Sequence, residues 1–185
     1  MRVLEHFTAV YEVRMTAAGA NSVQRVRLVV RLPDWRMDTE KSDGSISTSL
    51  VKDGNYYQCG DGVCIRIAGL DKELPERFLL SRALDRLRSE YAQIGDGTPE
   101  TVRGHPAVCY RFGPTPRPQS PDPPDYYFSD TACFDDRGIL VREVSRGGSA
   151  VVFVTERDLI DFSETVAVAA FSLPFEVTST VEISP

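Results

Sequence analysis

The sequence lacks the features that mark a membrane-spanning protein. No uninterrupted apolar run approaches the ~18 residues that a transmembrane helix needs. The first residues, MRVLEHFTAVYEV, lack the apolar core of a signal peptide. We therefore expect no transmembrane segment in this sequence, and an exported protein would have its signal removed or outside it.

Positive charge is also scarce. The chain has 21 Lys and Arg against 27 Asp and Glu, which gives a net charge of -6 and a pI near 5.0. Nonspecific binding to nucleic acid depends on clustered basic side chains that neutralise phosphates. We expect no nucleic-acid partner. With 185 residues, of which 42% are hydrophobic, the chain fits a single globular domain over residues 1–185.

Common catalytic motifs are missing. The sequence has no G-x-S-x-G elbow, no H-E-x-x-H pair and no Gly-rich phosphate loop. Its two histidines, His6 and His105, fit surface or turn positions better than a general base. The acidic pairs Asp135–Asp136 and Asp158–Asp161 could form acid/base couples or calcium ligands, but solvated turns at strand ends are favoured. We expect no enzyme activity, no cofactor and no metal site.

What the sequence contains is a repeated strand pattern. The segments TAVYEVRMTAAG and SVQRVRLVVRLP alternate apolar with polar residues, and Gly19–Ser22 between them predicts a hairpin turn. The alternation continues through residues 35–68, interrupted by turn signals at Asp43–Gly44, Asp53–Gly54 and Gly60–Gly62. It resumes after residue 100, with turns at residues 136–138 and 146–148. This pattern predicts half-buried antiparallel strands.

One segment has a helical period. Leu80, Leu84, Leu87 and Tyr91 recur at spacings of four, three and four, which places them on one helix face. The segment starts after Pro75 and ends at Gly95. One helix among about nine to eleven antiparallel strands predicts an α+β fold, because no regular strand–helix alternation supports a parallel sheet. Six prolines from Pro114 to Pro124 predict an exposed, extended loop over residues 113–125.

The four cysteines form two pairs around predicted strands. Cys59 and Cys64 flank a Gly-Asp-Gly turn in QCGDGVC, where their side chains can face each other across a hairpin. Cys109 and Cys133 flank the proline-rich loop. A zinc site usually uses tight C-x2-C pairs, and a thioredoxin-like site needs C-x-x-C at a helix start. Two disulfides are favoured, with zinc as the alternative, and disulfides indicate an oxidising, extracytoplasmic compartment.

The order of several short segments resembles the LolA-type lipoprotein-carrier superfamily, which includes LppX/LprG-like lipid carriers. The resemblance extends from about Phe7 to Val177. It rests on VVRLPDWRMD, SLVKDGNYYQC, the helical FLLSRALDRLRS, FDDRGILVREVS and the closing AAFSLPFEV. The superfamily has an arginine before the proline of its first long turn, but here Leu32 precedes Pro33 and Arg31 lies one residue earlier. This offset places the arginine on the opposite strand face, so the family's lid function is not carried over.

The resemblance implies a strongly curved, open antiparallel half-barrel wrapped around one or a few helices, with an apolar cavity that holds acyl chains. We therefore expect a non-enzymatic, extracytoplasmic domain, exported or lipid-anchored, that binds or carries a lipid or the acyl part of a lipoprotein. The ligand-contacting side chains are expected among the apolar residues of the sheet and helix: Val30, Trp35, Met37, Phe78, Leu80, Leu84, Leu87 and Phe128.

A second hypothesis belongs to a different class of function. The curved sheet, or the proline-rich loop over residues 113–125, would bind another envelope protein or a peptide, because extended Pro-rich segments are common recognition elements. The domain would then be an interaction or sensor module. The sequence specifies which strand faces are apolar but leaves the ligand, partner, membrane tether and oligomeric state open.

Overall fold

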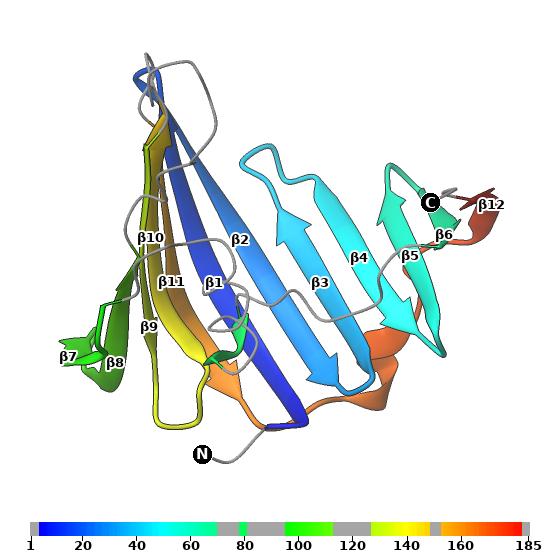
Figure 1. Ribbon diagram of the computed structural model, residues 1–185. Helices are drawn as coiled ribbons and strands as arrows, with labels where there is room; N and C mark the ends of the chain where they lie inside the picture. The colour runs from blue at the N-terminus through cyan, green and yellow to red at the C-terminus, as the bar shows by residue number, and fades with distance from the viewer. Residues whose placement is uncertain (1–3, 70–77, 81–94, 113–126, 149–152, 183–185) are drawn as a thin grey trace. The chain divides into compact units, whose positions relative to one another are not determined.

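The computed structural model describes residues 4–69, 78–80, 95–112, 127–148 and 153–182 (Figure 1). Its elements are twelve strands and one short 3-10 helix. They are β1 (His6–Ala17), β2 (Ala20–Arg31), β3 (Asp34–Glu40), β4 (Ile46–Lys52), β5 (Asn55–Gly60), β6 (Val63–Ala68), β7 (Thr98–Val102), β8 (His105–Phe112), β9 (Tyr127–Phe134), β10 (Leu140–Gly148), β11 (Phe153–Ser163), η2 (Val168–Phe171) and β12 (Val177–Glu182).

The strands are hydrogen-bonded in the order β12-β6-β5-β4-β3-β2-β1-β11-β10-β9-β8-β7. Successive strands from β2 to β6 and from β7 to β11 pair antiparallel wherever their register is defined, as the alternating sequence pattern predicts. The exception is β12, which pairs parallel with β6. A parallel pair needs a long connection between its strands, and here the chain returns to β6 from more than a hundred residues downstream.

The predicted α+β fold class, with a half-barrel of about nine to eleven strands wrapped around helices, is wrong. The described residues form a twelve-stranded sheet, and their one complete helix is the four-residue η2. The helix expected between Pro75 and Gly95 falls largely outside the described residues. At its start, Leu79 forms a β-bridge with Ile139 and the amide of Leu80 donates to the carbonyl of Gly138. The period-two alternation therefore governs the described fold.

Four hairpins of the described residues close through two-residue turns that end in glycine. In each, a residue with a φ of 49–51° precedes a glycine with a φ of 70–84°, the pair of positive φ angles typical of a type I′ turn. The turns are Ala18–Gly19, Asp53–Gly54, Asp61–Gly62 and Arg103–Gly104. The Asp53–Gly54 turn was predicted, but the first turn lies earlier than the predicted Gly19–Ser22, because Gly19 supplies the second positive φ of the turn. The β2–β3 connection contains a cis Leu32–Pro33 bond.

The chain divides into two compact units. Unit 1 comprises residues 1–3, 13–22 and 75–159, and unit 2 comprises residues 4–12, 23–74 and 160–185. A buried cluster of unit 1 contains Val102, Ala107, Val141 and two cysteines, and one of unit 2 contains Val29, Leu50 and Phe171. The expectation of a single domain over residues 1–185 stays a prediction. Among the described residues, no helix has the length and hydropathy to cross a membrane.

Both predicted disulfides are present. Cys59 bonds Cys64 across β5 and β6, and Cys109 bonds Cys133 across β8 and β9. Each pair lies directly opposite in the register of its hairpin, with Cα atoms 4.1 and 3.9 Å apart. The zinc alternative is therefore excluded, since no free cysteine remains.

Candidate functional site

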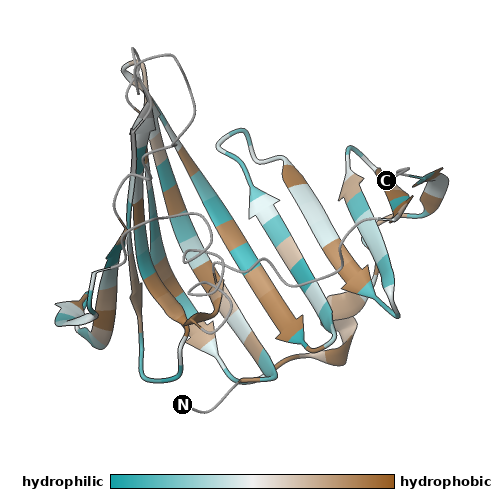
Figure 2. Cartoon of the chain, in the orientation of Figure 1, coloured by the Kyte–Doolittle hydropathy of each residue, from teal (hydrophilic) through white to brown (hydrophobic). Residues whose placement is uncertain are grey.

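Two of the predicted site residues of unit 2, Val30 and Trp35, lie in a row that crosses five strands. Directly opposed residues of an antiparallel pair project to the same face of a sheet. The register places Val30 opposite Trp35, Trp35 opposite Val51, Val51 opposite Tyr56, and Tyr56 opposite Ile67. All five side chains are apolar or aromatic. Figure 2 shows the underlying alternation, with apolar and polar residues following each other along these strands.

A second row lies on the same face, two residues further along each strand. Its members, in strand order, are Leu28, Met37, Ser49, Gln58 and Ile65. The polar members satisfy one another: Ser49 Oγ donates to Gln58 Oε1 at 2.9 Å, and the hydroxyl of Tyr56 donates to the same oxygen at 3.1 Å. The two rows together are called the apolar face below.

Burial on the apolar face decreases from β2 toward β6. Val30, Trp35 and Val51 are at most 3% exposed, whereas Tyr56 and Ile67 are only half-buried. In the second row Leu28 is fully buried, but Met37 and Ile65 are half-buried. Trp35 and Tyr56 meet edge to face, with ring centroids 6.0 Å apart. The β5–β6 side therefore offers partly accessible aliphatic and aromatic surface, which suits an apolar ligand rather than bond-making chemistry.

The opposite face of the same strands is covered by the C-terminal part of the chain. Phe171 of η2 packs on Val29 and Leu50, and the guanidinium of Arg31 lies 5.0 Å from the Phe171 ring centroid. Arg36 fixes this segment, because its Nη1 donates to the carbonyls of Ala170 and Ser172 at 3.1 and 2.9 Å.

Asp38 orients this arginine. Its carboxylate accepts from Arg36 Nε at 2.8 Å and from Thr48 Oγ1 at 2.6 Å. Sequence analysis did not identify Arg36 as a structural residue. The available signal was its alternation with Trp35 and Met37, which assigns it to the other strand face.

The structure brings together three of the eight predicted ligand-contacting residues. Val30, Trp35 and Met37 share the apolar face of unit 2, whereas Phe78 and Leu80 belong to unit 1. Phe78 is buried, with the guanidinium of Arg157 5.4 Å from its ring centroid. Leu84 and Leu87 lie outside the described residues, and the backbone of Phe128 pairs with Gly147 in β9. Ligand contact stays a prediction for all eight.

The acidic pairs considered as acid/base or calcium candidates have different surroundings from one another. Asp135 holds the β9–β10 turn by accepting from the amides of Arg137 and Ile139 at 3.0 and 2.9 Å. Asp158 does not lie in a solvated turn, as predicted, but is buried within β11. Its partners are arginine side chains, and among them Arg103 Nη2 donates to Asp158 Oδ2 at 2.8 Å. Asp161 is exposed and accepts from the amide of Phe162.

The described residues bring three potential metal ligands within 4.8 Å of one another: Glu100, Cys109 and Cys133. The two sulfurs are joined in a disulfide, so they offer no thiolate to a metal ion. Both histidines are exposed, and His105 starts β8 directly after a turn, as its sequence context predicts.

A scan against protein-family models and a search of curated proteins both return no match. Among solved structures, LppX of Mycobacterium tuberculosis matches with a TM-score of 0.46 and 15% identity, over 87% of this chain and 88% of that one. A LolA superfamily protein of Nitrosomonas europaea matches with a TM-score of 0.42 and 12% identity, over 92% and 91%.

MucB of Pseudomonas aeruginosa, solved in complex with MucA, matches with a TM-score of 0.41 and 17% identity over 91% of this chain. This chain spans about half of the MucB chain, 55% of its length. The structural matches thus include a LolA superfamily protein, the family that the sequence motifs resemble.

Proposed function

We propose that this chain is an extracytoplasmic, non-enzymatic domain that binds a hydrophobic ligand, a lipid or the acyl chains of a lipoprotein, on its apolar face. The observation that carries the proposal is the decrease in burial along that face. Met37, Tyr56, Ile65 and Ile67 present half-buried apolar surface next to the fully buried residues of β2 and β3. Removing such surface from water would stabilise a bound acyl chain by about 25 cal/mol per Å².

Two further features support this assignment. The short helix η2 packs on the opposite face of β2–β5. The half-buried aliphatic side chains Met37, Ile65 and Ile67 lie on the other side of the sheet, on the apolar face. The two disulfides support an oxidising compartment, where an envelope lipid-binding domain would work. The resemblance of the sequence motifs to the LolA-type superfamily points in the same direction.

Trp35 allows a direct test, because it is the only tryptophan of the chain and lies in the first row of the apolar face. Titrating delipidated protein with a brominated fatty acid should quench the Trp35 fluorescence in a saturable way. An Ile67→Glu variant should bind about tenfold more weakly or worse, since a carboxylate would have to be desolvated beside the acyl chain.

Ile46→Glu is the matched control. Ile46 lies on the opposite face of β4 and is 55% exposed, so the same substitution there should leave quenching unchanged. Native mass spectrometry of protein extracted from its host should in addition find co-purifying lipid. Unsaturable quenching, or equal effects of the two variants, would overturn the proposal.

A further inference from the structure

Unit 1 contains three arginines gathered on one buried carboxylate. Asp158 lies in β11, and its side chain is only 6% exposed. Arg103 Nη2 is 2.8 Å from Oδ2, Arg14 Nη1 is 3.6 Å from the same oxygen, and Arg142 Nε is 3.8 Å from Oδ1. Arg142 lies directly opposite Asp158 in the β10–β11 register. We call Arg14, Arg103 and Arg142 the arginine cluster.

The arginine cluster gathers more guanidinium groups than one buried carboxylate needs. Asp158 supplies one carboxylate, and Glu156 Oε2 lies 4.0 Å from Arg14 Nη1. The cluster is thus a local gathering of basic side chains in a chain whose net charge is -6. A single bidentate arginine would satisfy a buried carboxylate, so pairing Asp158 does not require three guanidinium groups.

The three arginines can reach a solute. Their side chains are 46%, 44% and 45% exposed for Arg14, Arg103 and Arg142, although Asp158 beneath them is buried. Each guanidinium carries five N–H donors, whereas a carboxylate accepts only about four hydrogen bonds. Among the described residues, Asp158 Oδ1 accepts no hydrogen bond. Asp158 thus orients the cluster electrostatically and leaves N–H donors available.

The backbone at Arg103 adds an independent argument. Arg103 is the first residue of its type I′ turn, with a φ of 49°. This position favours Asn, Asp or Gly, because other side chains are strained at positive φ. Two of the other three hairpin turns of this kind have Asp there. An arginine in this position is strained and gains a contact to Asp158, and such strained backbone positions cluster at functional sites.

We propose that the arginine cluster binds a phosphoryl oxyanion, supplied by an anionic lipid headgroup or by free phosphate. Guanidinium forks match the oxygen geometry of a phosphoryl group and form charge-assisted hydrogen bonds to it. A tetrahedral anion above Asp158 would accept hydrogen bonds from more than one arginine at once. The buried carboxylate holds the guanidiniums in place before the anion arrives.

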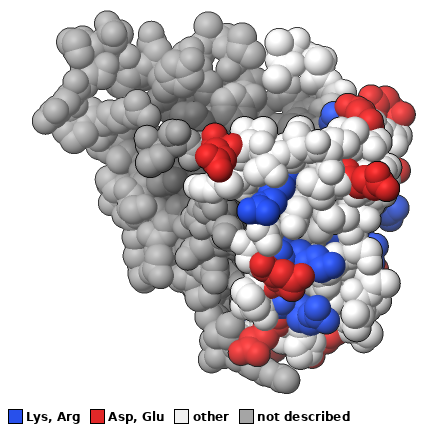
Figure 3. Space-filling model, turned by 90° about the vertical axis from the view of Figure 1, so that its right-hand side faces the viewer, with Lys and Arg blue, Asp and Glu red and all other residues white. Residues whose placement is uncertain are grey.

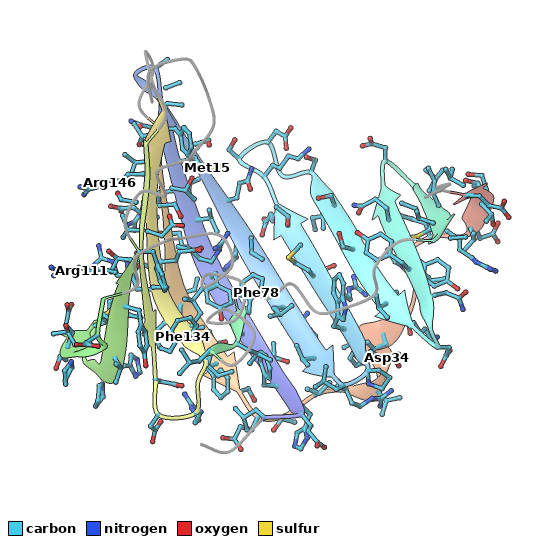
Figure 4. The ribbon with its side chains drawn as sticks, viewed as in Figure 1. Met15, Asp34, Phe78, Arg111, Phe134 and Arg146 are labelled. Atoms are coloured by element: carbon cyan, nitrogen blue, oxygen red, sulfur yellow. A yellow bond between two sulfur atoms is a disulfide. The ribbon has the colours of Figure 1, made fainter. Side chains whose placement is uncertain are left out.

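The surroundings extend the positive charge on the same face. Arg111 is opposite Thr131, which is opposite Val144, so Arg111 shares the face of Arg142 and Arg146. Figure 4 shows Arg111 and Arg146 projecting to the same side of the β8–β10 strands. Arg111 is 78% exposed and lies 4.0 Å from Glu100. Arg111 therefore provides a matched charge on the same face but outside the cluster.

The first test titrates the protein with inorganic phosphate against chloride at equal ionic strength, following the melting temperature and the heat of binding. The wild type should show saturable stabilisation by phosphate. Arg142→Gln should weaken phosphate binding about tenfold, the loss expected for one charge-assisted hydrogen bond. Arg111→Gln removes the same charge from the same face outside the cluster and should change binding less than about twofold.

A second measurement separates the two sources of the anion. Vesicles of phosphatidylcholine with and without phosphatidylglycerol are sedimented with wild-type, Arg142→Gln and Arg111→Gln protein. Retention that requires phosphatidylglycerol and Arg142 assigns a lipid headgroup, whereas phosphate binding without retention assigns free phosphate. Ile67→Glu should keep phosphate binding, so a failure of the apolar-face proposal is distinguishable from a failure here. The proposed site is overturned if the wild type shows neither phosphate stabilisation nor vesicle retention. It is also overturned if Arg142→Gln and Arg111→Gln lose binding to the same extent.

Discussion

The apolar face of unit 2 and the arginine cluster of unit 1 share one structural feature but differ in the chemistry of their side chains. Both place residues directly opposite each other on neighbouring strands: Trp35 against Val51, and Arg142 against Asp158. In unit 2 the opposed side chains are apolar, and their burial contributes to folding. In unit 1 they are charged, and because the arginines are half-exposed, solvent screens part of their attraction to the buried Asp158. The comparison indicates that opposed apolar residues stabilise the sheet by burial, whereas opposed charged residues fix the positions of polar groups.

Charge is distributed differently elsewhere on the molecule. On the face drawn in Figure 3, basic and acidic side chains of the described residues are interspersed. Interspersed charges keep a surface soluble without attracting either sign. Three guanidiniums around one carboxylate depart from that pattern, which is why the arginine cluster, and not the rest of the charged surface, is assigned a ligand.

The largest expected effect tests whether the apolar rows hold unit 2 together. Trp35→Ala should lower the free energy of unfolding by about 4 kcal/mol, because it removes a buried aromatic side chain and leaves a cavity beside Tyr56. Urea unfolding followed by circular dichroism measures this loss. Val23→Ala, at a 46% exposed position, should cost less than about 0.5 kcal/mol. Similar losses for both variants would break the distinction between the apolar face and exposed surface.

The two disulfides provide the next comparison, since each unit contains one. The Cys109–Cys133 bond of unit 1 spans 24 positions, whereas Cys59–Cys64 of unit 2 spans 5. On a chain-entropy basis, replacing the first pair with Ala should cost about 3.5 kcal/mol and the second about 2 kcal/mol. Chemical denaturation of the two double variants gives both values. A reversed order would show that strain or denatured-state structure, rather than loop closure, dominates.

Much of the strand pattern was predictable from sequence because its determinants are local. Alternation in VYEVRM and VRLVV identified β1 and β2, and the Asp53–Gly54 signal located the β4–β5 turn. The disulfides followed from the positions of the cysteines on opposed strands. The α+β class was wrong because the described residues form a twelve-stranded sheet, beside which η2 is the one complete helix.

The arginine cluster could not be predicted, because its residues are distant in sequence. Arg14, Arg103, Arg142 and Asp158 come from β1, the β7–β8 turn, β10 and β11, and only strand order and register bring them together. Sequence reasoning noticed Asp158 but assigned it to a solvated turn. The parallel return of β12 to β6 is likewise set by long-range pairing that no local pattern encodes.

A third prediction sharpens the comparison at the arginine cluster itself. Asp158→Asn should lower the free energy of unfolding by about 2 kcal/mol, since three guanidiniums lose their shared carboxylate while solvent screens part of their repulsion. Phosphate should restore part of this loss and stabilise the variant more than the wild type. Thermal melts at increasing phosphate, with chloride at equal ionic strength as the control, measure the destabilisation of the variant and its stabilisation by phosphate. If phosphate stabilised the Asp158→Asn variant less than the wild type, this prediction would be contradicted.

The smallest expected effect contrasts a carboxylate held by arginines with one held by hydrogen bonds alone. The hydroxyl of Ser45 donates to Asp43 Oδ1 at 2.6 Å and its amide at 2.9 Å, which lowers the pKa of Asp43 even though this carboxylate is fully exposed. A lowered folded pKa stabilises the protein above the ordinary Asp value of about 3.9, and that stabilisation disappears as pH falls through the folded pKa. Ser45→Ala should therefore raise the pKa of Asp43 in a carboxyl NMR titration and cost stability at neutral pH but not in strong acid. A pKa that rises equally in Lys41→Gln, where the hydrogen bonds remain, would mean that charge dominates at this turn as it does around Asp158.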